Sequence, residues 1–282
     1  MFSDILLTVD IDRTLTAPDG SIPERNTEAI RYFMANGGSF TVNTGRSTTT
    51  MKPLLSRILV NAPLLLYNGS AAWQDGNIYD SVPIELDMWS TVEAVHAAFP
   101  EMNVEIQALD GHYVLDPKPE YMEFYKAQNW ELQTAVPGTD LGPFIKFAIF
   151  GEIHENAFSH MFSGTPYEMQ RLQELGQFIM ERWGDKVDIF YATPRIVDVH
   201  AKGVSKLQAA RRLQKQLGKK ILVCVGDADN DVPMLEGADF AYCPSDSVVR
   251  DRFENVCSCA EGAIADVIYK KIPEILGITL DR

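Results

Sequence analysis

Two aspartates, Asp10 and Asp12, lie directly after a short apolar segment near the start of the chain. Ile5–Val9 is predicted to be a buried strand, because ILLTV shows no apolar–polar alternation. The carboxyl end of such a strand is where open α/β sheets place their ligands. One carboxylate could be a nucleophile and the other a general acid and then a base, since departure of a leaving group and attack of water need opposite proton transfers. Strand-end aspartates also bond to their own turns, so the pair alone leaves both interpretations open.

A second segment, VNTGRS, follows an expected strand at Phe40–Val42. The hydroxyl of Thr44, the small residue Gly45 and the amides of a starting helix could hold a phosphate oxygen. Arg46 could add a forked contact to a phosphate or a carboxylate. The same residues also suit an ordinary capped helix start, so this segment is informative only together with others.

A lysine, Lys206, lies in the first turn of an expected helix after the sequence KGVS. A positive charge there opposes the helix dipole unless an anion compensates it. Pairing with a nucleophilic aspartate and a phosphate would supply that compensation. A solvated lysine is the alternative, and Lys202 competes for the role, although we favour Lys206.

The sequence GDADNDVPML follows another expected strand, Ile221–Val225. Four of the five residues at 227–231 are polar, which is a poor choice for a turn unless a cation neutralises them. A calcium loop would need glycine where Val232 stands and glutamate where Ala238 stands. Magnesium fits better, because it takes one or two carboxylates and completes its shell with water and substrate phosphate.

The order of the elements predicts an α/β fold with a Rossmann-like parallel-sheet core and an inserted α+β cap. Strand–helix–strand order implies right-handed crossovers between parallel strands. Residues 1–83 and 192–282 are assigned to the core, and 84–191 to the cap. The expected core strands are 5–9, 40–42, 63–67, 221–225 and 240–242. The expected core helices are 22–36, 48–59, 204–217, 232–236 and 262–275, the first of them capped by Ser21 in the sequence at 21–24. The cap is expected to contain helices at 88–99 and 167–183 and a strand at 144–150.

All four segments lie at the carboxyl end of an expected core strand or open the next helix, so a parallel sheet would gather them in one crevice. Asp10 and Asp227 would then flank a metal that faces a phosphate held by Thr44 and Lys206. This arrangement supplies charge neutralisation, which is most of what phosphoryl transfer requires.

At this point the chain resembles the haloacid dehalogenase-like phosphatases, and within them the Cof-type branch with a large cap inserted after the second motif. The resemblance covers nearly the whole chain and rests on DIDRTLT, TGRS, GVSK and GDADNDVPML in the family's order. Tyr67-Asn68-Gly69, a feature that this branch often shows after its third strand, supports it.

The resemblance implies a magnesium ion bound by the carboxylates of Asp10 and Asp227 and by the backbone carbonyl of Asp12. It makes Asp10 the nucleophile that forms an aspartyl-phosphate and Asp12 the acid and base. Asp231 would orient the metal's waters or Lys206. Substrate or phosphate binding would fall to Thr44, Gly45, Arg46, Asn68, Lys206 and Asn230.

Two positions depart from the family's pattern. Arg13 stands where glycine is usual, and residues 241–245 read AYCPS after the fourth motif. We hypothesise that Arg13 points aside or meets an acidic substrate.

The bulk composition limits the partners. The formal charge of −14 disfavours nucleic acid and anionic membranes, which an acidic protein repels. The N-terminus lacks the features of a signal peptide, and no apolar run is long enough to span a bilayer. The cysteines, which lack zinc-site spacing, are expected to be free thiols in a reducing compartment. We therefore expect a cytoplasmic monomer or homodimer that acts on a small-molecule phosphate ester.

Three functions remain open. The first is a phosphatase for a sugar phosphate or a similar phosphomonoester. A phosphomutase would return the phosphoryl group of Asp10 to a sugar phosphate instead of to water. A non-catalytic regulator that binds a phosphorylated metabolite would need none of the reactive side chains, so the presence of Asp10, Asp12, Lys206 and Asp227 argues against it.

Overall fold

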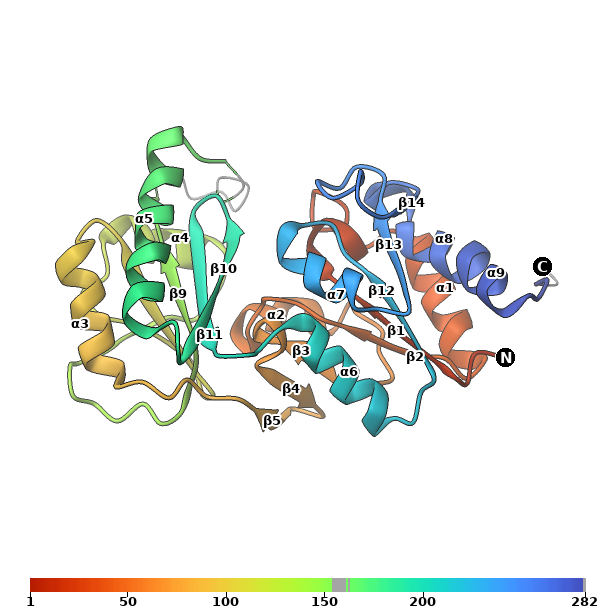
Figure 1. Cartoon of the computed structure of the whole chain (residues 1–282), viewed down its shortest axis with the longest axis horizontal. Coiled ribbons are helices and arrows are strands. Elements are labelled where there is room, and N and C mark those ends of the chain that lie inside the picture. The colour runs from red at the N-terminus through yellow and green to blue at the C-terminus, as the bar shows by residue number, and fades with distance from the viewer. Residues whose placement is uncertain (154–160, 162, 281–282) are drawn as a thin grey trace. The chain divides into compact units, whose positions relative to one another are not determined.

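The computed structural model describes residues 1–153, 161 and 163–280 and divides into two compact units (Figure 1). The first unit consists of Met1–Gly45, Pro53–Tyr79 and the chain from Ser205 onward. The second consists of Arg46–Lys52 and Asp80–Val204. The expected fold class, a parallel-sheet α/β core with an inserted α+β unit, is confirmed.

A five-stranded parallel sheet forms the centre of the first unit, in the order β14-β13-β12-β1-β2 (Figure 1). Its strands are β1 (Ile5–Val9), β2 (Ser39–Val42), β12 (Ile221–Val225), β13 (Phe240–Pro244) and β14 (Glu254–Val256). β1 and β12 are central and almost completely buried, which explains why their sequences are apolar without alternation. Val9 pairs with Val225, so the residues that follow these two strands leave the sheet side by side.

A smaller sheet continues this arrangement beyond β2. Asn43 forms an isolated parallel bridge with Leu65 of β3 (Leu64–Leu66). β3 also belongs to a three-stranded sheet with β4 (Ala71–Gln74) and β5 (Asn77–Ser81). The ends of β1, β2, β3 and β12 therefore lie along one edge of the first unit.

Helices cover the core sheet. They are α1 (Glu24–Ala35), α6 (Lys206–Gln216), α7 (Val232–Glu236), α8 (Ala263–Asp266) and α9 (Ile272–Leu276), while α2 (Thr48–Leu55) joins the two units in sequence. Leu213 of α6 and Met234 of α7 pack in one cluster with Leu6 and Leu222 of the sheet. The expected cap of α1 does not form, because the Ser21 hydroxyl donates instead to Asp19 at 2.6 Å.

The second unit is built on a six-stranded sheet with the order β10-β11-β9-β6-β7-β8. Its strands are β6 (Asn103–Ala108), β7 (His112–Val114), β8 (Gln133–Thr134), β9 (Phe144–Phe150), β10 (Val187–Thr193) and β11 (Ile196–Ala201). α3 (Met88–Ala98) and α5 (Pro166–Trp183) pack on one face of this sheet, and α4 (Pro119–Ala127) contributes to a separate apolar cluster with Ala148 and Phe150 of β9.

The boundaries of the second unit differ from the predicted 84–191. Apart from Arg46–Lys52, the unit extends from Asp80 to Val204, and it includes β11 because β11 pairs with both β9 and β10 in the same sheet. The predicted boundaries place the residues of β11 in the core instead.

All four cysteines are free, and Cys224, Cys243 and Cys259 are buried. Over residues 1–153, 161 and 163–280, no helix has the length and apolarity that a bilayer crossing needs.

Candidate active site

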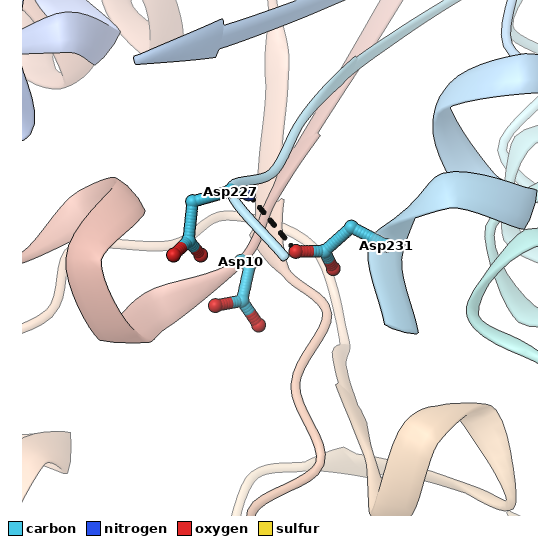
Figure 2. Close-up of side chains that lie close together, drawn as sticks. All are labelled: Asp10, Asp227 and Asp231. Atoms are coloured by element: carbon cyan, nitrogen blue, oxygen red, sulfur yellow. Dashed lines mark hydrogen bonds between the residues drawn. The ribbon is translucent and has the colours of Figure 1, made fainter. Parts of the chain in front are cut away.

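Three carboxylates converge at the edge of the core sheet where β1 and β12 end (Figure 2). Asp10 follows β1, and its backbone N–H donates to the Val225 carbonyl at 2.9 Å, which continues the pairing of the two strands by one residue. Asp227 follows β12, and Asp231 lies in the turn before α7. One carboxylate oxygen from each of the three lies within 4.8 Å of the others, and all three residues are buried.

Lys206 supplies the positive charge of this cluster. It is the first residue of α6, directly after Ser205, whose hydroxyl accepts the N–H of Gln208 and caps the helix. The Lys206 Nζ donates to Asp10 Oδ1 and to Asp231 Oδ1, at 2.6 Å in each case. Lys202, the rival in the sequence, instead contacts Asp188 at 2.7 Å within the second unit.

Asp231 is held by the backbone of its own turn. Its Oδ2 accepts the N–H groups of Asp227 at 3.0 Å, shown dashed in Figure 2, and of Ala228 at 3.2 Å. A Cβ atom on Gly226 would lie 2.6 Å from the Asp231 side chain, so this approach requires glycine. Asp231 therefore links Lys206 to the backbone of the turn that carries Asp227.

The charges of the cluster do not balance, because three carboxylates surround one ammonium group. Burial raises the pKa of Asp10 to about 7, although Lys206 lowers it, and the neighbouring carboxylates add to the rise. Burial and the charge of Asp10 raise the pKa of Asp227 to about 8. Burial lowers the pKa of Lys206, but the charges of Asp10 and Asp231 outweigh it and hold this pKa above its usual value. Oxygen donors that are buried and short of positive charge suit a hard divalent cation such as Mg²⁺.

The turn after Asp10 carries Asp12 and an unusual backbone conformation. The Thr16 N–H donates to the Ile11 carbonyl at 2.9 Å, and Arg13 has φ 60° and ψ 13°, in the left-handed region. This conformation favours glycine over a residue that has a side chain. The Arg13 side chain is exposed and Asp12 is half-buried.

The residues expected to bind phosphate lie beside one another on the next two strand ends. Thr44 donates its N–H to the Leu65 carbonyl at 2.9 Å and accepts the N–H of Asn68 on its own carbonyl at 2.9 Å. Thr44 and Asn68 are both buried. A Cβ atom on Gly45 would lie 2.9 Å from Asn68 Oδ1. Glycine at position 45 therefore leaves room for the side-chain amide of Asn68.

Two other expected site residues are placed differently. Asn230 is half-buried in the turn at 229–231. Arg46 belongs to the second unit, where its guanidinium donates to the Thr50 carbonyl at 3.1 Å.

The structure also brings two unassigned residues to the site. The buried Thr14 hydroxyl donates to Asp227 Oδ1 at 3.0 Å. The Asn43 side chain reaches the backbone of Lys206. Both stand inside the sequence motifs, at positions 14 and 43, but neither spacing nor residue type distinguished them from turn residues.

Known proteins were compared with this chain. A family model described as haloacid dehalogenase-like hydrolase matches residues 7–248. An HMP-PP phosphatase from Yersinia enterocolitica is 26% identical over 239 residues, which cover 82% of this chain and 80% of that protein. A 5-amino-6-(5-phospho-D-ribitylamino)uracil phosphatase from Bacillus subtilis is 21% identical, covering 83% of this chain and 80% of that protein.

Solved structures agree on the fold. A haloacid dehalogenase-like hydrolase from Bacteroides thetaiotaomicron superposes with a TM-score of 0.77 at 18% identity, covering 95% of this chain and 98% of that one. The expected family resemblance is therefore confirmed. The chain belongs to the haloacid dehalogenase-like hydrolases.

Proposed function

We propose that the protein is a magnesium-dependent phosphatase that hydrolyses a small phosphorylated metabolite through an aspartyl-phosphate at Asp10. The observation that carries the proposal is the contact of Lys206 Nζ with Asp10 Oδ1 at 2.6 Å, beside the buried carboxylate of Asp227. A phosphatase needs a nucleophile kept ionised and a surplus of positive charge for the phosphoryl group. Lys206 helps to keep Asp10 ionised and contributes one positive charge. The excess of carboxylates favours a bound cation that would supply further positive charge.

The cation would be held by the carboxylates of Asp10 and Asp227 and by the backbone carbonyl of Asp12. When bound, it would neutralise charge on the phosphoryl oxygens and keep the two buried carboxylates ionised. The Thr14 hydroxyl, 3.0 Å from Asp227 Oδ1, would fix the direction of the second carboxylate.

The reaction would proceed in two displacements at phosphorus. Asp10 attacks with its carboxylate, the ester P–O bond breaks, and Asp12 gives its proton to the leaving oxygen. Water then attacks the aspartyl-phosphate, Asp12 takes the proton of that water, and the bond from Asp10 to phosphorus breaks to release inorganic phosphate. The half-buried position of Asp12 suits this part, because the residue must exchange protons with substrate and water in turn.

The remaining side chains would bind the substrate. Thr44, Lys206 and Asn230 would hold the phosphoryl group, with the narrow turn at Gly45 bringing Asn68 close to it. Arg46 would contact the remainder of the substrate. The inserted unit, predicted from sequence as residues 84–191, would select among phosphate esters.

Two lines of support bear on the substrate and the compartment. The names of the matched relatives specify small phosphorylated compounds. We infer a sugar phosphate or a similar phosphomonoester as the substrate class. The acidic composition and the free cysteines favour a cytoplasmic monomer or homodimer without nucleic-acid or membrane partners.

Release of inorganic phosphate from a panel of phosphate esters, with and without Mg²⁺, tests the proposal. We expect Asp10→Asn to lower turnover by about 10³-fold or more, since it removes the nucleophile. Asp19→Asn is the matched control, because Asp19 is an exposed turn residue of the same unit. Acid quenching during turnover should trap phosphate on Asp10.

Other outcomes point elsewhere. Turnover by Asp10→Asn at the rate of the control variant would refute the proposal. An isomerised product without phosphate release would identify a phosphomutase, and binding without either product would identify a regulator.

A further inference from the structure

Asn43 lies where the second motif begins and is completely buried. Its backbone N–H donates to the Val9 carbonyl at 2.8 Å, and the residue bridges to Leu65 on the other side. The backbone of Asn43 is therefore fixed between β1 and β3, one residue before Thr44.

The side-chain amide of Asn43 contacts two further segments of the site. Its Nδ2 donates to the Lys206 carbonyl at 2.8 Å and approaches Met234 Sδ at 3.5 Å. Carbonyl oxygen and thioether sulfur are both acceptors, so only the orientation that points the NH₂ group at them is favourable. One side chain thus joins the end of β2 to the first turn of α6 and to α7.

The other end of the amide indicates why an asparagine stands here. Over the described residues, Asn43 Oδ1 is buried and has no hydrogen-bond partner. A buried acceptor without a partner is costly, and an apolar side chain of similar size would avoid that cost. Packing alone therefore does not explain an amide at this position, whereas its two donated contacts do.

We propose that Asn43 is a positioning residue for the reaction, which holds the backbone of Lys206 so that Nζ reaches Asp10 and Asp231. Lys206 is held at two points: its carbonyl by Asn43, and its Nζ by the two carboxylates at 2.6 Å. The first turn of a helix lacks part of its own hydrogen bonding, so an external contact there fixes its place. The effect on turnover rests on the proposed phosphatase function.

Steady-state kinetics of Asn43→Ala tests this role. We expect kcat to fall about 10- to 100-fold with KM changed little, because a displaced Lys206 stabilises the transition state less well. Asn61→Ala is the matched control. Asn61 also makes two backbone contacts, to the N–H of Phe40 at 2.8 Å and the carbonyl of Gly38 at 2.9 Å, but at the opposite end of β2. Asn61→Ala should lower the melting temperature and leave kcat within about twofold of the parent.

A second variant separates donation from packing. Asn43→Asp keeps the size of the side chain but directs an acceptor at the Lys206 carbonyl, so we expect a loss of kcat at least as large as in Asn43→Ala. If Asn43 only fills space in the core, Asn43→Asp should have the kcat of the parent protein, and that result would overturn the proposal. This variant also serves if the smaller side chain prevents folding.

Crystal structures of the variants test the positioning without any need for turnover. In Asn43→Ala, we expect Lys206 Nζ to lie beyond hydrogen-bonding distance of the Asp10 or the Asp231 carboxylate. If Nζ stays 2.6 Å from both carboxylates, the inference is wrong. A parent protein that hydrolyses no ester would refute the proposed function, while the crystal structures would still decide the role of Asn43.

Discussion

The stability of the magnesium-free protein is expected to fall as the pH rises from 6 to 8. Burial and like charge raise the pKa of Asp10 to about 7 and that of Asp227 to about 8, from an ordinary value of 3.8. Across this range the unfolded chain carries both carboxylates ionised, whereas the folded chain binds protons. Unfolding therefore releases protons, and the stability present at low pH is lost as the pH passes through the folded pKa values.

The size of the effect follows from proton linkage. For independent sites, ionising Asp10 and Asp227 in the folded state from pH 6 to pH 8 costs about 4 kcal/mol together, the larger part of it at Asp227. His200 acts in the opposite direction, because burial and the charge of Lys146 hold its pKa well below 6.5. The unfolded chain gains a proton at that histidine near pH 6, which lowers stability there by about 1 kcal/mol. His96 acts in the same direction as His200, because burial lowers its pKa. We expect a net loss of about 2 to 3 kcal/mol between pH 6 and pH 8.

Urea unfolding in the presence of a chelator, at pH 6, 7 and 8, measures this loss. Excess Mg²⁺ should stabilise the protein most at pH 8, because the ion binds the ionised carboxylates and competes with protons. Asp227→Asn removes one titrating group and should reduce the loss by about 2 kcal/mol. A chelated parent protein whose stability stays constant or rises over this range, or an Asp227→Asn variant with the parent's pH dependence, would show that the reasoning is wrong.

Two further variants examine the turn that follows Asp10. Arg13→Gly should raise the free energy of unfolding by about 0.5 to 1 kcal/mol in urea titrations, because the strain at φ 60° exceeds the entropy cost of glycine; a loss of stability would contradict this. If its turnover and ester preference also match the parent, Arg13 does not contact the substrate. Thr14→Val keeps the shape of the buried side chain but removes the hydrogen bond to Asp227, so calorimetry should show that the affinity for magnesium falls about tenfold. An unchanged affinity would show that Thr14 contributes only to packing.

The core fold could be predicted because its signals are local. Apolar segments such as 5–9 and 221–225 are continuous only where a strand is buried on both faces. In a parallel sheet the carboxyl ends of these strands share one edge. The proximity of Asp10 and Asp227 could therefore be predicted from the sequence. The choice of Lys206 over Lys202 also agrees with the contacts of the two side chains.

Other features depend on contacts that no local pattern records. The later boundary of the inserted unit depends on such a contact, because only the pairing of β11 with β9 and β10 assigns that strand to the second unit. Thr14 meets Asp227 across 213 positions of the chain, and Asn43 meets Lys206 across 163. A threonine and an asparagine in strand-end turns are common, so their partners had to be observed.

The hydrogen bonds within the cluster separate the roles of its three similar carboxylates. Asp231 accepts from Lys206 and from two backbone N–H groups, which compensate its charge where it stands. By contrast, Asp10 accepts from Lys206 and Asp227 accepts from Thr14. Asp10 and Asp227 are buried in a site with one ammonium group, so both are short of positive charge, and burial together with neighbouring carboxylates raises the pKa of each carboxyl. A divalent cation would relieve that shortage most effectively at Asp10 and Asp227, so the carboxylates that destabilise the metal-free fold are those best suited to bind the metal.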